Sequence, residues 1–151
     1  MTRTRAIWVL GMHRSGTSLV AGALRLLGAE LGPPDGILPA DPEDNPRGYW
    51  EQQAVIDLNN DLLGRFGGSS WAPPALPDGW TDRPELDDLR ERARTILSTF
   101  DQSAVWAVKD PRVSLTLPFW LPLVDESAAR VYSSQTPVQA RRDSGPSGSR
   151  A

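Results

Sequence analysis

The residues with the clearest chemical meaning lie near the start of the chain, where residues 11–18 read GMHRSGTS. Gly11 and Gly16 are separated by four residues and are followed by Thr17 and Ser18, which is the spacing of a phosphate-binding loop. Glycines let successive backbone N–H groups point at an anion, and a helix that starts after the loop adds the positive end of its dipole. Nucleoside triphosphatases keep a lysine at the position of Thr17. The spacing therefore predicts an anion site without that lysine.

Arg14 supplies a cation from inside this loop. An exposed helix N-terminus stabilises an anion by only about 0.3–1 kcal/mol, so the site also needs a formal positive charge. A guanidinium can bridge two anionic oxygens, and it stays charged at any physiological pH. The adjacent His13 either orients the loop or contacts a ligand, or else it is an ordinary, partly buried histidine.

A second charged group, Lys109, Asp110 and Arg112, follows the apolar run AVWAV. Such a run is typical of a buried strand, and α/β sheets bind ligands at the C-terminal ends of their strands. Lys109 is therefore either a ligand-binding residue or a surface lysine paired with Asp110. Arg112 either contacts the ligand or pairs with an acidic residue.

The surrounding pattern predicts the elements that would position these residues. Residues 6–10 and 104–108 are expected to be buried strands. Apolar residues recur at helical spacing in segments 18–27, 51–63, 84–100 and, interrupted by two prolines, 114–125. The connections between them are rich in Pro and Gly and predict irregular structure. Strands separated by helices indicate an α/β fold with a parallel sheet.

Composition excludes several classes of function. The chain has 151 residues, the size of about one domain, and a formal net charge of −3, whereas a nucleic-acid-binding domain is usually basic. It contains no cysteine and one histidine, so we expect no metal site. No apolar run approaches the roughly 18 residues of a membrane span. We therefore expect a cytoplasmic protein that binds neither nucleic acid nor metal.

Three motifs in order, GMHRSGTSLVAGAL, DNPRGYWE and WAVKDPRVSLTLPFW, resemble the bacterial P-loop sulfotransferase family over residues 6–125. The family transfers a sulfuryl group from 3′-phosphoadenosine 5′-phosphosulfate to an acceptor hydroxyl or amine. The resemblance implies a three-layer P-loop-type fold that needs no metal. It also implies that the loop holds the 5′-phosphosulfate of one nucleotide in place of the β- and γ-phosphates of ATP.

The resemblance assigns expected roles to individual residues. Arg14 would neutralise the oxygen that bridges phosphorus and sulfur, and Lys109 would lie beside the sulfuryl group. The expected donor-binding residues are His13, Arg14, Ser15, Gly16, Thr17, Ser18 and Arg112.

An acceptor hydroxyl also needs a general base. Many relatives use a histidine two residues after the lysine, where this chain has Pro111. Other branches use a glutamate after the first helix, which makes Glu51 the candidate and Asp57 a weaker one. The alternative for Glu51 is an ordinary place in the first turn of a helix. The acceptor is unidentified: the tryptophans Trp50, Trp71 and Trp80 either line a carbohydrate or lipid pocket or anchor the core and loops.

The resemblance weakens toward the C-terminus. The family has a further core strand near residue 130, whose end carries Arg and Ser residues that hold the 3′-phosphate, and this sequence is expected to lack both. We therefore expect a partial domain over residues 1–130 and a disordered, non-family tail over residues 131–151, through truncation or a frameshift. Such a protein would be inactive or would self-associate through an exposed sheet edge. The alternatives are a non-catalytic nucleotide-binding remnant and a small P-loop kinase, the latter disfavoured by Thr17.

Overall fold

A parallel sheet of three strands lies at the centre of the protein, whose computed structural model describes residues 4–100, 103–124 and 129–133. The strands are β1 (Arg5–Leu10), β2 (Val105–Lys109) and β3 (Ala129–Ser133), in the order β2-β1-β3. Val9 pairs with Lys109 and Leu10 pairs with Ser133. The C-terminal ends of all three strands therefore meet at one edge of the sheet, next to residue 11.

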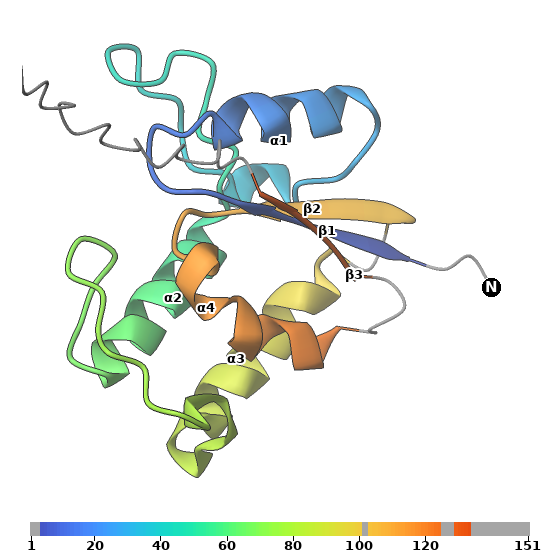
Figure 1. Cartoon of the computed structure of the whole chain (residues 1–151). Helices are drawn as coiled ribbons and strands as arrows, with labels where there is room; N and C mark the ends of the chain where they lie inside the picture. The colour runs from blue at the N-terminus through green and yellow to red at the C-terminus, as the bar shows by residue number, and fades with distance from the viewer. Residues whose placement is uncertain (1–3, 101–102, 125–128, 134–151) are drawn as a thin grey trace, which may run out of the picture.

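Helices cover both faces of this sheet (Figure 1). Helix α1 (Thr17–Leu26) lies over one face, and α2 (Gln53–Arg65), α3 (Asp87–Ser98) and α4 (Val113–Trp120) lie over the other. Single 3-10 turns occupy Pro34–Gly36, Trp80–Asp82, Pro84–Leu86 and Leu121–Leu123. In the described part of the chain no helix has the length and apolar character needed to cross a membrane. The fold is thus α/β, as predicted.

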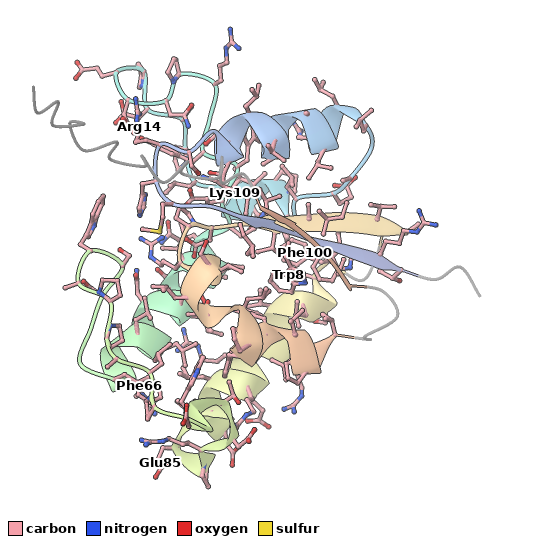
Figure 2. All side chains as sticks on the ribbon, viewed as in Figure 1. Trp8, Arg14, Phe66, Glu85, Phe100 and Lys109 are labelled. Atoms are coloured by element: carbon pink, nitrogen blue, oxygen red, sulfur yellow. The ribbon has the colours of Figure 1, made fainter. Side chains whose placement is uncertain are left out.

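Apolar side chains along β1 and β2 alternate between the two faces of the sheet, which explains why helices cover both faces. Ala6, Trp8 and Trp106 pack into the larger core beneath the sheet, where Trp8 also contacts the Trp120 ring of α4. Ile7 and Ala107 point to the opposite face and pack with residues of the α1 side. Strands buried on both faces are typical of parallel sheets in α/β proteins. Figure 2 shows Trp8 and Phe100 on the side of α2–α4, with Arg14 on the other side.

Most predicted element positions are confirmed within a few residues, with one consequential exception. Helix α2 starts at Gln53, so Glu51 precedes the helix and does not belong to its first turn. Trp50 has φ of 60°, a left-handed conformation that is rare for a bulky residue. The Glu51 side chain that follows lies in the interior, where it is 8% exposed.

The expectation that the strand near residue 130 is lost was wrong. Residues 129–133 form β3, which pairs with β1 from Ala6 to Leu10. The apolar run in ARVYS is short and is followed by a polar sequence, but Val131 and Tyr132 are of types that favour strands, and the edge of β1 supplies a ladder partner. The strand runs three residues past the predicted domain boundary at residue 130. The rest of the predicted tail, residues 134–151, lies outside the described residues.

Candidate functional site

The loop between β1 and α1 leads into a helix whose first backbone N–H groups have no acceptor among the described residues. Gly16, with φ of 86°, is the N-cap of α1 and forms no side-chain cap. Within the described ranges, the N–H groups of Gly16, Thr17 and Ser18 donate to no acceptor. The first loop N–H, that of Gly11, is used differently, because it donates to Ser114 Oγ at 3.0 Å and so ties the loop to α4. The loop is therefore tied to α4, while the first N–H groups of α1 stay unused within the described residues, and such groups can bind an anion.

A cavity of about 340 Å³ opens in front of these donors. Three parts of the chain line it: the loop with the start of α1, the segment from Asp44 to Glu51, and the end of β2. The lining residues are His13, Arg14, Gly16, Thr17, Ser18, Asp44, Asn45, Tyr49, Glu51, Lys109 and Pro111. We call this space the loop cavity. Figure 2 shows Arg14 on the loop and Lys109 near the sheet, both at the end of the molecule where the loop lies.

Arg14 is held by a carboxylate from a distant loop. Its Nη1 donates to Asp44 Oδ1 at 2.8 Å, and Tyr49 donates its hydroxyl to the other oxygen, Oδ2, at 2.9 Å. The two charged side chains are 75% and 54% exposed. Arg14 has φ of 64°, a left-handed conformation that costs free energy in a residue other than glycine. The Asp44 carboxylate thus already pairs with Arg14, a cation of the loop between β1 and α1.

The turn that carries Asp44 is ordered by its own hydrogen bonds. Asp41 Oδ1 accepts from the N–H groups of Glu43 and Asp44 at 2.8 and 3.1 Å, and these bonds lower the pKa of the Asp41 carboxyl. Asn45 Nδ2 donates to Ser18 Oγ at 3.1 Å, which links the turn to α1. The turn therefore contacts the loop at Arg14 and the start of α1 at Ser18.

A second ion pair joins Lys109 and Glu51 on the inner wall of the loop cavity. Lys109 Nζ donates to Glu51 Oε1, and the side chains are only 3% and 8% exposed. Burial raises the pKa of the Glu51 carboxyl above its ordinary value, an effect that the Lys109 ammonium partly opposes and the Asp110 carboxylate reinforces. A carboxylate whose pKa is raised by burial is better suited to accept a proton near neutral pH.

Asp110 connects the site to the helices beneath the sheet. It is fully buried and accepts from Asn59 Nδ2 and from Arg112 Nη1, both at 2.8 Å. Asn59 Oδ1 in turn accepts from Thr116 Oγ1 and Trp120 Nε1 at 2.8 and 2.9 Å. Asp110 is therefore engaged by Arg112 and Asn59, and the interpretation of Lys109 as a surface lysine paired with Asp110 was wrong.

The structure brings most of the predicted site residues together. Arg14, Glu51 and Lys109 line one cavity with His13 and the residues from Gly16 to Ser18. Ser15 is directed elsewhere, because its hydroxyl donates to Met12 O at 2.6 Å. Arg112 lies outside the loop cavity and pairs with an acid, as its alternative interpretation holds. Asp57 is exposed and accepts from Gln53 Nε2 at 2.8 Å, away from the loop cavity.

The three candidate tryptophans occupy different environments. Trp80 is part of the core beneath the sheet. Trp50 packs against the smaller core on the α1 side, with the Arg25 guanidinium 5.2 Å from its ring centroid. Trp71 is 80% exposed and stacks on the His13 ring with centroids 4.6 Å apart.

Sequence reasoning missed the roles of Asp44, Asn45 and Tyr49. All three lie in the stretch DNPRGYW, which contributed to the family resemblance without any residue being assigned a contact. The only signal was the concentration of polar residues with Gly and Pro in a long connection, where binding residues are often found.

Comparisons of the chain with protein-family models, with curated proteins and with solved structures gave no match. A function must therefore be inferred from the residues and their geometry.

Proposed function

We propose that this chain transfers a sulfuryl group from 3′-phosphoadenosine 5′-phosphosulfate to an acceptor hydroxyl, using a P-loop-type fold. The observation that carries the proposal is the position of the buried Glu51–Lys109 pair in the same cavity as the unused loop donors. An anion site alone would explain binding. An adjacent carboxylate with a raised pKa adds a group that can accept a proton from the acceptor.

The loop would hold the donor. The N–H groups from Gly16 to Ser18 and the positive end of α1 are suited to the 5′-phosphate, and Arg14 is suited to the bridging oxygen. In the transfer step the acceptor oxygen attacks sulfur, the bond between sulfur and the bridging oxygen breaks, and its electron pair stays on the phosphate. Negative charge therefore grows on the bridging oxygen, where a guanidinium stabilises it most effectively.

The Glu51–Lys109 pair would couple proton transfer to charge stabilisation. When the acceptor proton moves to the Glu51 carboxylate, that side chain becomes neutral, and the Lys109 ammonium loses the charge of its partner. The ammonium is then available to the sulfuryl oxygens at the moment of transfer. Because both groups are buried, their interaction with the reacting atoms is weakened little by water.

The test is binding followed by turnover. Thermal unfolding of the chain is measured with 3′-phosphoadenosine 5′-phosphate, the product of the donor, and separately with ATP and magnesium. At 100 times the dissociation constant the nucleotide should add about 2.7 kcal/mol of stability, and Arg14→Ala should reduce this gain. Sulfuryl transfer to a panel of hydroxyl acceptors is then compared between the unmodified chain and Glu51→Gln.

Each alternative gives a different result. Stabilisation by magnesium ATP without stabilisation by the bisphosphate would replace the proposal with a P-loop kinase. Tight binding of the bisphosphate without transfer to any acceptor would identify a non-catalytic nucleotide-binding protein.

A further inference from the structure

A second cavity adjoins the loop cavity and shares part of its wall. It has a volume of about 300 Å³, within the usual range for small-molecule sites. His13, Tyr49 and Glu51 line both cavities, whereas Gln53, Ile56 and Arg112 line the second one only. Glu51 therefore lies in the wall between two cavities: Lys109 and the loop line the first with it, and Gln53, Ile56 and Arg112 line the second with it. This is the arrangement that a transfer between two bound molecules requires.

We propose that the second cavity is the acceptor site and that the acceptor is a neutral carbohydrate, whose reacting hydroxyl points at Glu51. This inference rests on the proposed function for the identity of the reaction.

The charges around the second cavity are already balanced. Glu51 is paired with Lys109, and Arg112 is paired with the buried Asp110. A charged acceptor would meet no free opposite charge among these residues, and burial would penalise its transfer from water. The lining instead offers neutral oxygen acceptors, the Gln53 amide oxygen and the Tyr49 hydroxyl oxygen, while the Gln53 amide nitrogen and the Tyr49 hydroxyl donate to Asp57 and Asp44. A neutral molecule with several hydroxyl groups matches this lining.

His13 provides an independent sign of a missing ligand group. Its Nε2 is buried and has no hydrogen-bond partner in the described part of the chain. A buried polar atom without a partner costs free energy, so such atoms often mark places where a ligand completes the site. His13 lines both cavities, and an acceptor hydroxyl between them would supply the absent partner.

Trp71 extends the site outward. One face of its indole lies against the His13 ring, while the side chain as a whole is 80% exposed, so its other face is open. A sugar ring presents slightly positive C–H groups that pack on the negative face of an aromatic ring. Trp71 therefore provides a stacking surface beside a residue of the cavity wall.

A lipid acceptor fits a different place that lacks the reacting groups. A more apolar depression, of about 530 Å³, lies along α1, and its lining includes Leu19, Ala23, Leu26 and Trp50. Among the described residues it shares only Ser18 and Asn45 with the loop cavity, and its lining includes neither Glu51 nor Lys109. An alkyl chain bound there would not bring a hydroxyl to the proposed base.

The experiment measures carbohydrate binding and donor binding separately. Neutral methyl glycosides of glucose, galactose and mannose are tested by saturation-transfer NMR against the full chain, with and without 3′-phosphoadenosine 5′-phosphate. The variants are Trp71→Ala, Trp71→Phe and Gln53→Ala, with Leu26→Ala as a control for loss of an exposed apolar side chain away from both cavities. Because Trp71 is exposed, its replacement should not affect folding.

The proposal predicts binding of at least one glycoside, weakened about tenfold by Trp71→Ala and less by Trp71→Phe. Leu26→Ala should leave glycoside binding unchanged, and all variants should bind the bisphosphate normally. Binding of the bisphosphate without binding of any glycoside would overturn the acceptor inference while leaving the proposed function intact. Transfer to a long-chain alcohol or a phenol in preference to glycosides would overturn it as well. If the bisphosphate fails to bind, the proposed function falls, and glycoside binding that depends on Trp71 would still support a carbohydrate site.

Discussion

The two ion pairs of the loop cavity have the same formal composition and opposite environments. Arg14–Asp44 is largely exposed, at 75% and 54%, whereas Lys109–Glu51 is almost completely buried, at 3% and 8%. An exposed pair is worth about 0–1 kcal/mol and can open readily. A buried pair that loses one partner leaves an uncompensated charge in the interior. The exposed Arg14–Asp44 pair, the outer pair, is thus suited to exchange its carboxylate for a ligand. The buried Lys109–Glu51 pair, the inner pair, is suited to move a proton without separating.

The largest effect is expected from breaking the inner pair. Glu51→Ala leaves the Lys109 ammonium buried without its partner and should reduce the free energy of unfolding by about 3–5 kcal/mol. The double variant Glu51→Gln, Lys109→Met removes both charges and should recover most of this loss. Urea unfolding of the three proteins measures the difference. If the single and double variants are equally destabilised, packing and not charge determines the stability of this region.

A smaller effect is expected from removing the outer cation. Arg14→Ala should weaken binding of 3′-phosphoadenosine 5′-phosphate by about 1.5–3 kcal/mol, the usual contribution of a hydrogen bond to a charged group. Titration calorimetry measures the affinity. Arg14→Gly serves as the matched variant, because it also relieves the left-handed backbone at this position and should be more stable than Arg14→Ala. Unchanged affinity in both variants would remove Arg14 from the donor site.

The two pairs also differ in how far they could be predicted from the sequence. The loop with Arg14 followed from local spacing between an apolar run and a helical pattern, and the structure has that strand, loop and helix. Glu51 was named from a family resemblance, while its helical alternative failed because α2 begins at Gln53. Glu51 follows a left-handed backbone at Gly48 and Trp50, which no hydrophobic periodicity encodes.

Long-range contacts made by irregular segments were the least predictable. Asp44 reaches Arg14 across thirty positions of sequence, from a connection for which composition predicts only irregularity. The strand β3 was missed for a related reason, because its apolar run is short and its pairing with β1 is a long-range contact that the local pattern does not display. The backbone of Glu30 likewise covers the outer edge of β2, donating to Val105 O and accepting from Ala107 N. Self-association through a sheet edge therefore remains a prediction for β3 alone.

The burial of the inner pair also predicts a pH dependence of stability. Because the folded protein raises the pKa of Glu51, it holds that proton more tightly than the unfolded chain does. The stability from this group is complete at pH below its ordinary pKa of 4.5 and is lost as pH rises through the raised value. Asp41, whose pKa is lowered, acts in the opposite direction. The measurement is therefore the difference in unfolding free energy between the unmodified chain and the double variant Glu51→Gln, Lys109→Met as pH rises from below 4.5. A difference that does not change with pH would contradict the raised pKa of Glu51.

The smallest effect tests whether the outer pair yields to a ligand. Asp44 places a carboxylate on Arg14 within the loop cavity, so a bound phosphate must displace it or tolerate its charge. Asp44→Asn removes that competition and should strengthen binding of the bisphosphate by up to about fivefold, since an exposed pair contributes at most about 1 kcal/mol. Asp61→Asn, which removes the similarly exposed partner of Arg92, is the control and should leave affinity unchanged. Weaker binding in Asp44→Asn would mean instead that the carboxylate holds the guanidinium in its binding orientation, and the outer pair would then resemble the inner one in needing both partners.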